Sequence, residues 1–130
     1  MRNLFKLILL ILSLIPLYFG LSGALGGALS LNGGEAVSAN LENQFRYLSG
    51  FYLTLAFLIW WFLRDIDNRG TVLALIVGAI FIGGLARLYC HFAVGPAEAK
   101  QIGGMILELS SPLLIVWQRA LARSVGPVIP

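Results

Sequence analysis

Four long apolar segments constrain this chain more than any other feature of its sequence. They cover about residues 4–29, 44–63, 72–94 and 102–121, and turn-forming or charged residues separate them. Each segment exceeds the roughly 17 residues that a helix needs to cross the hydrocarbon core of a bilayer. Unpaired backbone groups are costly in lipid, and the sequence lacks the alternating strands of a closed barrel. The sequence therefore predicts an all-α integral membrane protein with four spanning helices.

The composition supports this class and disfavours other ones. Of the 130 residues, 58% are hydrophobic and 12% are charged, which is about half the charged fraction of a soluble domain. Four spans use nearly the whole length, so we expect a single transmembrane domain over residues 1–130 and no separate soluble domain. The net charge of +3 comes from isolated basic residues at segment ends, so the expected partner is the lipid bilayer and not nucleic acid.

Cysteine and histidine usage argues against cofactor and metal chemistry. Cys90 is the only cysteine, so the chain forms no internal disulfide and has no CxxC redox pair. His91 is the only histidine, which excludes bis-histidine haem ligation and disfavours a tetrahedral zinc site. Ser110 and Ser111 lie near Glu108, but no histidine on that segment could act as a base. We therefore expect a protein that is not an enzyme and that uses no metal or cofactor.

The loops and the basic residues predict the orientation of the helices. The loops at residues 64–70 and 95–100 are short, so neighbouring helices are expected to be antiparallel in an up-down four-helix bundle. Lysine and arginine concentrate on the cytoplasmic side of membrane proteins. With a cytoplasmic N-terminus, the opposite side carries only Arg46 and Lys100. The cytoplasmic side then carries Arg2, Lys6, Arg64, Arg69, Arg119 and Arg123. The prediction is a multi-pass protein of the bacterial inner membrane with both termini in the cytoplasm.

The first segment has a second interpretation. Arg2 and Lys6 precede a leucine-rich stretch that ends in small residues, which is also typical of a secretory signal peptide. This apolar stretch is long for a signal peptide, and Pro16 with the glycines after it suits a packed helix, so we expect the helix to be retained. Its small residues favour close helix contacts and permit a homo-oligomer or docking to a larger membrane complex. The small-xxx-small pairs are Gly20 with Ala24 and Gly23 with Gly27.

Arg87 and Glu108, two charges of opposite sign, lie inside apolar segments. Ionisable residues persist in hydrocarbon where they pair or where they line a wet cavity that has a function. Each residue lies about seven residues, or roughly 10 Å, below the outer end of its helix. Antiparallel neighbours place the two side chains at one depth, so we predict a salt bridge between them. The pair either only locks the two helices together or also belongs to a binding site.

Polar residues on three segments extend this site. The third segment carries a polar stripe at helical spacing, made of Gly83, Arg87 and His91. The fourth carries a second stripe, made of Gln101, Gly104, Glu108 and Ser111, with Pro112 expected to kink the helix just beyond it. At the outer end of the second segment, Glu42 is spaced for an i, i+4 pair with Arg46.

Together these residues predict a shallow polar pocket that opens outward. The predicted ligand contacts are Asn43, Arg46, Tyr47, Arg87, Gln101 and Glu108. Arg46 and Arg87 are expected to hold an anion, and Glu108 to orient Arg87.

Two sequence runs carry a family resemblance. Residues 41–52 (LENQFRYLSGFY) and 83–88 (GGLARL) resemble the bacterial DUF4345 family of small membrane proteins, over most of the chain. The resemblance implies a four-helix layout related to the DoxX-like membrane proteins, and it names no function. The positions that match the family pattern are Asn43, Gln44, Arg46, Gly50, Gly83, Gly84 and Arg87. DoxX-like proteins are thought to assist redox or respiratory assemblies, but a single cysteine argues against a direct redox role here.

Two functional hypotheses follow. The first is an accessory subunit of a membrane complex, or a binder of a small anionic or lipidic ligand in the outward-facing pocket. The alternative is a small proton-coupled multidrug-type exporter that uses the membrane-embedded Glu108. Exporters of this size carry their glutamate in the first helix, and here Arg87 is available to neutralise Glu108, so the first hypothesis is favoured.

Overall fold

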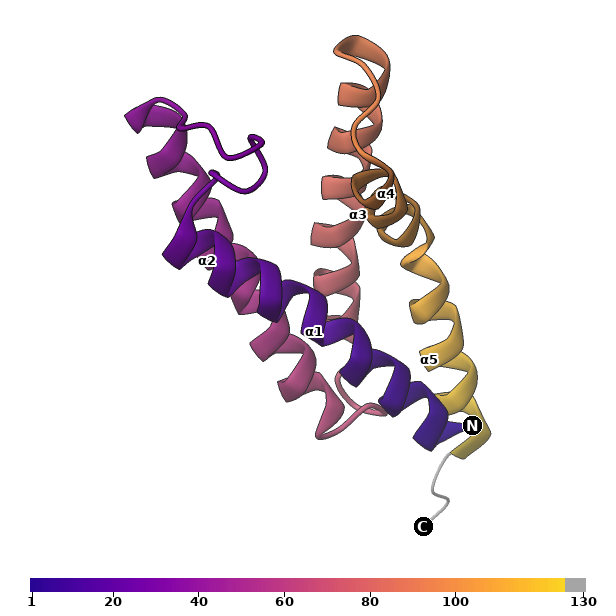
Figure 1. Ribbon diagram of the computed structural model, residues 1–130. Coiled ribbons are helices and arrows are strands. Elements are labelled where there is room, and N and C mark those ends of the chain that lie inside the picture. The colour runs from indigo at the N-terminus through magenta and orange to yellow at the C-terminus, as the bar shows by residue number, and fades with distance from the viewer. Residues whose placement is uncertain (126–130) are drawn as a thin grey trace. The chain divides into compact units, whose positions relative to one another are not determined.

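The computed structural model describes residues 1–125, which are built mainly from α-helices (Figure 1). Within these residues the helices are α1 (Arg2–Gly26), α2 (Ala39–Leu63), α3 (Gly70–Ala93), α4 (Ala99–Ser110) and α5 (Pro112–Val125). Helices α1, α2 and α3, and the stretch Ala99–Ser124 through α4 and α5, are long and apolar enough to cross a membrane. The predicted all-α class with four membrane-length helices is confirmed.

The chain divides into two compact units. One unit, Asn3–Arg64, contains α1 and α2, and the other contains Met1–Arg2 and the chain from Asp65 onward, with α3, α4 and α5. That the two units form a single transmembrane domain over residues 1–130 stays a prediction, and residues 126–130 of that range lie outside the described residues.

The ends of α1 and α2 differ from the ends of the apolar segments for local reasons. Helix α1 ends at Gly26 because Gly27 adopts a φ of 74°, a left-handed conformation that terminates a helix. Helix α2 begins at Ala39, earlier than the predicted residue 44. Its N-cap Ser38 accepts a hydrogen bond from the backbone N–H of Leu41 at 3.2 Å, and Glu42 lies in its first turn. Because its first turn is polar, α2 extends beyond the apolar segment.

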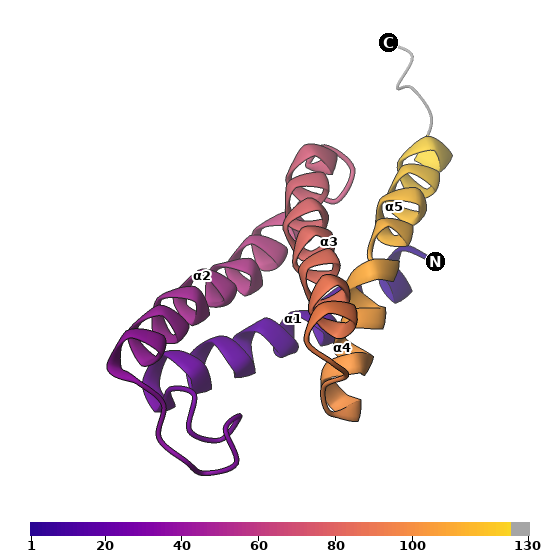
Figure 2. The same cartoon turned by 90° about the horizontal axis from the view of Figure 1, so that it is seen from above.

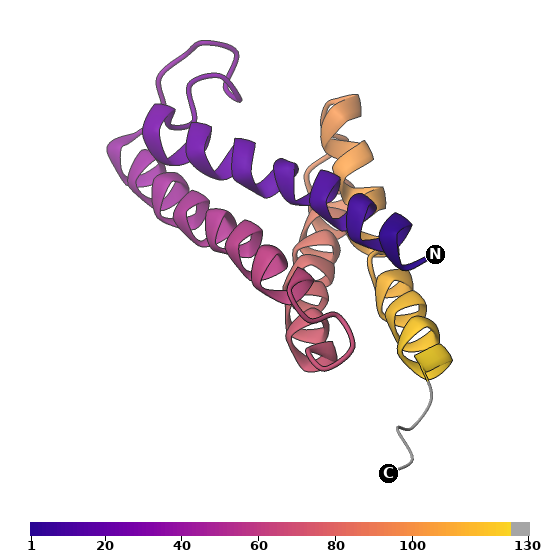
Figure 3. The same cartoon turned by 90° about the horizontal axis from the view of Figure 1, so that it is seen from below.

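Helices α1 and α2 form an antiparallel pair, which Figures 2 and 3 show from two sides. A Cβ atom at Gly20 would lie only 2.8 Å from the backbone of Leu53, so the two helices approach closely at this glycine. Further along, Trp60 Nε1 donates a hydrogen bond to Ser13 Oγ at 2.8 Å. The buried face of α1 recurs every three or four residues, at Phe5, Leu9, Ser13, Pro16, Gly20 and Gly23.

Helix α3 packs antiparallel against α4 and α5. Gly84 lies against the side chains of Glu108 and Leu109, and Gly70, at the start of α3, lies beside Gln118 on α5. Gln118 is buried, and its Nε2 donates a hydrogen bond to the carbonyl of Ile66 at 2.7 Å. This bond ties the loop before α3 to α5.

The fourth apolar segment, predicted as a helix over residues 102–121, is the membrane-length stretch Ala99–Ser124, and one residue interrupts it between α4 and α5. The interruption lies at Ser111, directly before Pro112, which has no N–H to donate to the carbonyl of Glu108. The Ser111 hydroxyl donates to this carbonyl instead, at 2.6 Å. The disturbance expected at Pro112 is therefore present, and it separates α4 from α5.

Candidate functional site

Arg87 on α3 and Glu108 on α4 form an ion pair. Arg87 Nε lies 3.1 Å from Glu108 Oε2, and the two side chains are 41% and 15% exposed. Gly84, one turn before Arg87, makes the approach possible, because a Cβ atom there would lie 2.9 Å from the Cβ of Glu108. The predicted salt bridge between Arg87 and Glu108 is confirmed.

Two residues on the same face of α4 hold the Arg87 guanidinium. Arg87 Nη1 donates a hydrogen bond to Gln101 Oε1 at 2.6 Å, and Glu108 follows Gln101 by seven residues, or two helical turns. Glu108 Oε2 is buried and makes no hydrogen bond among residues 1–125, so its contact with Arg87 is one of opposite charges without hydrogen-bond alignment. The guanidinium is thus fixed from two sides.

A cavity of about 220 Å³ opens beside this arginine. Arg87, Cys90 and His91 line it from α3, and Gln101, Ile102 and Met105 line it from α4. A water molecule occupies about 30 Å³, and sites for drug-sized ligands span roughly 300–1,000 Å³. The cavity therefore suits a headgroup or a small ion.

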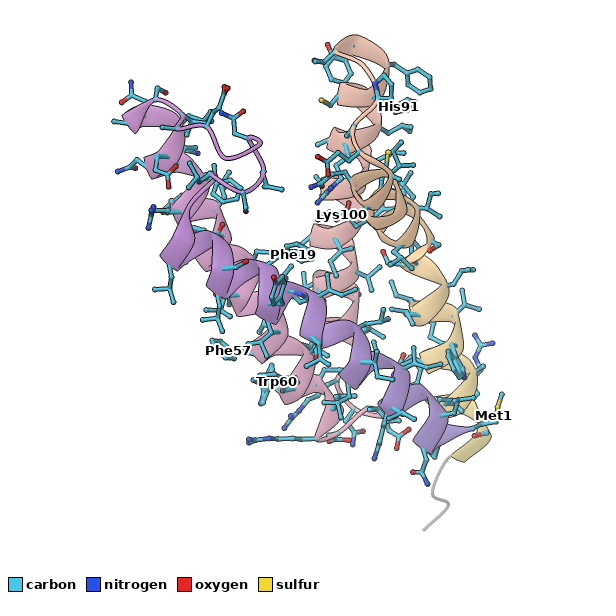
Figure 4. The ribbon with its side chains drawn as sticks, in the orientation of Figure 1. Met1, Phe19, Phe57, Trp60, His91 and Lys100 are labelled. Atoms are coloured by element: carbon cyan, nitrogen blue, oxygen red, sulfur yellow. The ribbon has the colours of Figure 1, made fainter. Side chains whose placement is uncertain are left out.

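His91 belongs to this cavity, although the sequence did not assign it to the ligand contacts. The residue lies near the end of α3 (Figure 4), and its ring packs edge-on against Phe92 at a centroid distance of 5.3 Å. Its Nδ1 is buried and has no hydrogen-bond partner among residues 1–125. The spacing Gly83, Arg87 and His91 was the available signal, because it places His91 one turn beyond Arg87 on the same face.

Arg46 has a different set of contacts, at the C-terminal end of α1. Its Nε donates to Glu42 Oε1 at 2.9 Å, and its Nη1 donates to the carbonyls of Ala24 and Leu25 at 3.2 and 2.9 Å. Glu42 Oε2 in turn accepts from the backbone N–H of Ala28 at 3.3 Å. A cation at the carbonyl end of a helix pairs with unpaired acceptors, and the negative end of the helix dipole stabilises it. Arg46 therefore caps α1, and the predicted Glu42–Arg46 pair is confirmed.

The six predicted ligand contacts fall into two groups. Arg87, Gln101 and Glu108 meet in the α3–α4 site. The other three lie on α2, where Asn43 is exposed and Tyr47, 59% exposed, packs its ring against Phe51 at a centroid distance of 4.9 Å. A common pocket for both groups stays a prediction.

Comparison with known proteins assigns the family. The model of a domain of unknown function, DUF4345, matches residues 4–118. The chain belongs to the DUF4345 family. The DUF4345 match includes all six predicted ligand contacts and His91, and the resemblance seen in residues 41–52 and 83–88 is confirmed at the level of the family. No curated protein and no solved structure matches the chain.

Proposed function

We propose that this DUF4345 protein is a multi-pass protein of the bacterial inner membrane that binds a small anionic or lipidic ligand in the cavity between α3 and α4. It acts as a binding protein or an accessory subunit and not as an enzyme. The observation that carries the proposal is the position of Arg87, which lines the cavity while Gln101 and Glu108 hold its guanidinium.

The fixed guanidinium supports binding for an energetic reason. An arginine within a membrane span is costly and is retained where it pairs or serves a ligand. Glu108 offsets part of this cost and orients the group, so less side-chain entropy is lost when a ligand binds. Arg46 is engaged at the end of α1, which leaves Arg87 as the main cationic contact of the proposed site.

Native mass spectrometry of the full chain in a mild detergent tests the proposal. We expect a small anionic or lipid species to travel with the wild-type protein and to be lost from Arg87→Gln. The control is Arg119→Gln, because Arg119 is an exposed arginine on α5 outside the cavity. Absence of any retained species contradicts ligand binding, whereas stoichiometric large subunits favour the accessory role.

The exporter remains the second candidate, because Glu108 is a carboxylate inside a helical stretch that is long and apolar enough to cross a membrane. Against it, Glu108 is paired with Arg87. Proton-driven uptake of a cation into proteoliposomes that Glu108→Gln abolishes would replace the binding proposal, and absence of flux favours binding.

A further inference from the structure

The polar side chains that line the α3–α4 cavity all offer hydrogen-bond donors. An arginine side chain has donors and no acceptor. Its Nη1 must therefore meet the oxygen of the Gln101 amide, which it does at 2.6 Å. This contact uses the amide oxygen and leaves the Nε2 donors of Gln101 for a ligand.

His91 adds a third donor. A neutral imidazole carries one protonated and one unprotonated nitrogen. A proton on Nδ1 would bury an N–H that has no acceptor among residues 1–125, and buried N–H groups without partners are rare. The proton is therefore expected on Nε2 of this cavity-lining ring.

From these contacts we infer that the cavity selects headgroups that carry hydrogen-bond acceptors and no donors, with an oxyanion such as a carboxylate as the preferred class. The inference rests on the proposed binding function and names its ligand class. Arg87, Gln101 and His91 each donate to the headgroup, and Ile102 and Met105 contact its apolar part.

Headgroups with donors are rejected for two reasons. An ammonium or hydroxyl hydrogen would face the donors of Arg87, Gln101 and His91, and binding sites discriminate strongly against such mismatches. An ammonium would also be repelled by Arg87. Octanoate and octylamine have chains of the same length and headgroups of opposite charge. A difference between their effects therefore reports on the headgroup and not on the hydrophobicity of the chain.

The reactivity of Cys90 can report ligand occupancy of the cavity in the wild-type chain. This residue is the only cysteine of the chain, it is exposed, and it lines the cavity. The rate at which a methanethiosulfonate reagent modifies Cys90 in the detergent-solubilised full chain therefore reports occupancy. Octanoate at about ten times its Kd slows modification about tenfold, whereas the same concentration of octylamine leaves the rate unchanged. Acetate in a parallel arm distinguishes a free anion from an amphiphile, and protection by either carboxylate supports the inference.

Gln101→Glu is the decisive variant. A glutamate still accepts from Arg87, but it replaces the Nε2 donors by a negatively charged acceptor. We expect the preference to reverse, with octylamine protecting Cys90 and octanoate failing to do so. His91→Phe keeps a ring and removes one donor, so the Kd for octanoate rises about fivefold. Arg119→Gln is the control and behaves as wild type, and the helical circular dichroism and the elution volume of each variant verify folding.

The failures of the inference and of the proposed function are distinguishable. Equal protection by octanoate and octylamine, or an unchanged preference in folded Gln101→Glu, overturns the donor-based selection and leaves ligand binding in place. No protection by any of the three probes overturns the inference. The mass-spectrometric experiment then decides separately whether ligand binding fails as well.

Discussion

Arg46 and Arg87 are both arginines with a nearby glutamate, and the contacts of their guanidinium groups separate their roles. Arg46 donates to two backbone carbonyls at the end of α1, so its charge serves the helix terminus. Arg87 donates to a side chain, Gln101, and lines a cavity. Both residues lie within the family match, and the cavity beside Arg87 offers space for a ligand.

A double-mutant cycle measures the Arg87–Glu108 pair. Arg87→Ala leaves the largely buried Glu108 without its counter-charge, and we expect the free energy of unfolding to fall by about 2–3 kcal/mol. Adding Glu108→Ala should recover about 1–2 kcal/mol of this loss, because the unpaired carboxylate is removed. Reversible unfolding by sodium dodecyl sulfate in mixed micelles provides the values, and simply additive losses would contradict the pairing.

Removing the cap on α1 should loosen one end of one helix. We expect Arg46→Ala to lower the free energy of unfolding by about 1 kcal/mol, and Arg46→Lys to lower it less, since lysine keeps the charge but not the planar fork. Hydrogen exchange should accelerate at Ala24–Ala28 and not at α3. Unchanged exchange at Ala24–Ala28, together with loss of octanoate binding, would instead assign Arg46 to the ligand.

At the scale of elements, glycines decide how closely the helices approach. Gly83 and Gly84 are adjacent on α3, yet a Cβ atom at Gly83 would meet nothing within 4 Å, whereas one at Gly84 would collide with Glu108 and Leu109 on α4. Gly84 thus sets the separation of α3 and α4 at the level of the ion pair. The break at Ser111 then lets α5 continue in its own direction along α3.

The two glycines form a matched pair for mutagenesis. Gly84→Ala should push α4 away and lower the free energy of unfolding by about 1–3 kcal/mol, with weaker protection of Cys90 by octanoate. Gly83→Ala should be neutral or raise the stability by up to about 1 kcal/mol, because alanine is the better helix former. Thermal unfolding in detergent compares the two, and equal effects would contradict the packing role of Gly84.

At the scale of the whole molecule, the distribution of basic residues predicts the membrane orientation. Six lysines and arginines fall on one side of the predicted bilayer and two on the other. With both termini in the cytoplasm, a green fluorescent protein fused to the C-terminus should fluoresce. Alkaline phosphatase inserted in the loop at residues 95–98 should be active. The opposite pattern, with an active C-terminal phosphatase fusion, would reverse the orientation and place the α3–α4 cavity on the cytoplasmic side.

Segment length and helical spacing by themselves determined the all-α class with four membrane-length helices and the meeting of Arg87 with Glu108. Both follow from a constant rise per residue and from the cost of unpaired backbone groups in lipid. Only the tertiary structure decided that Arg46 caps α1 and that His91 lines the cavity. Those outcomes depend on which donors reach which backbone carbonyls and on how closely two helices approach, and spacing along a single helix specifies neither.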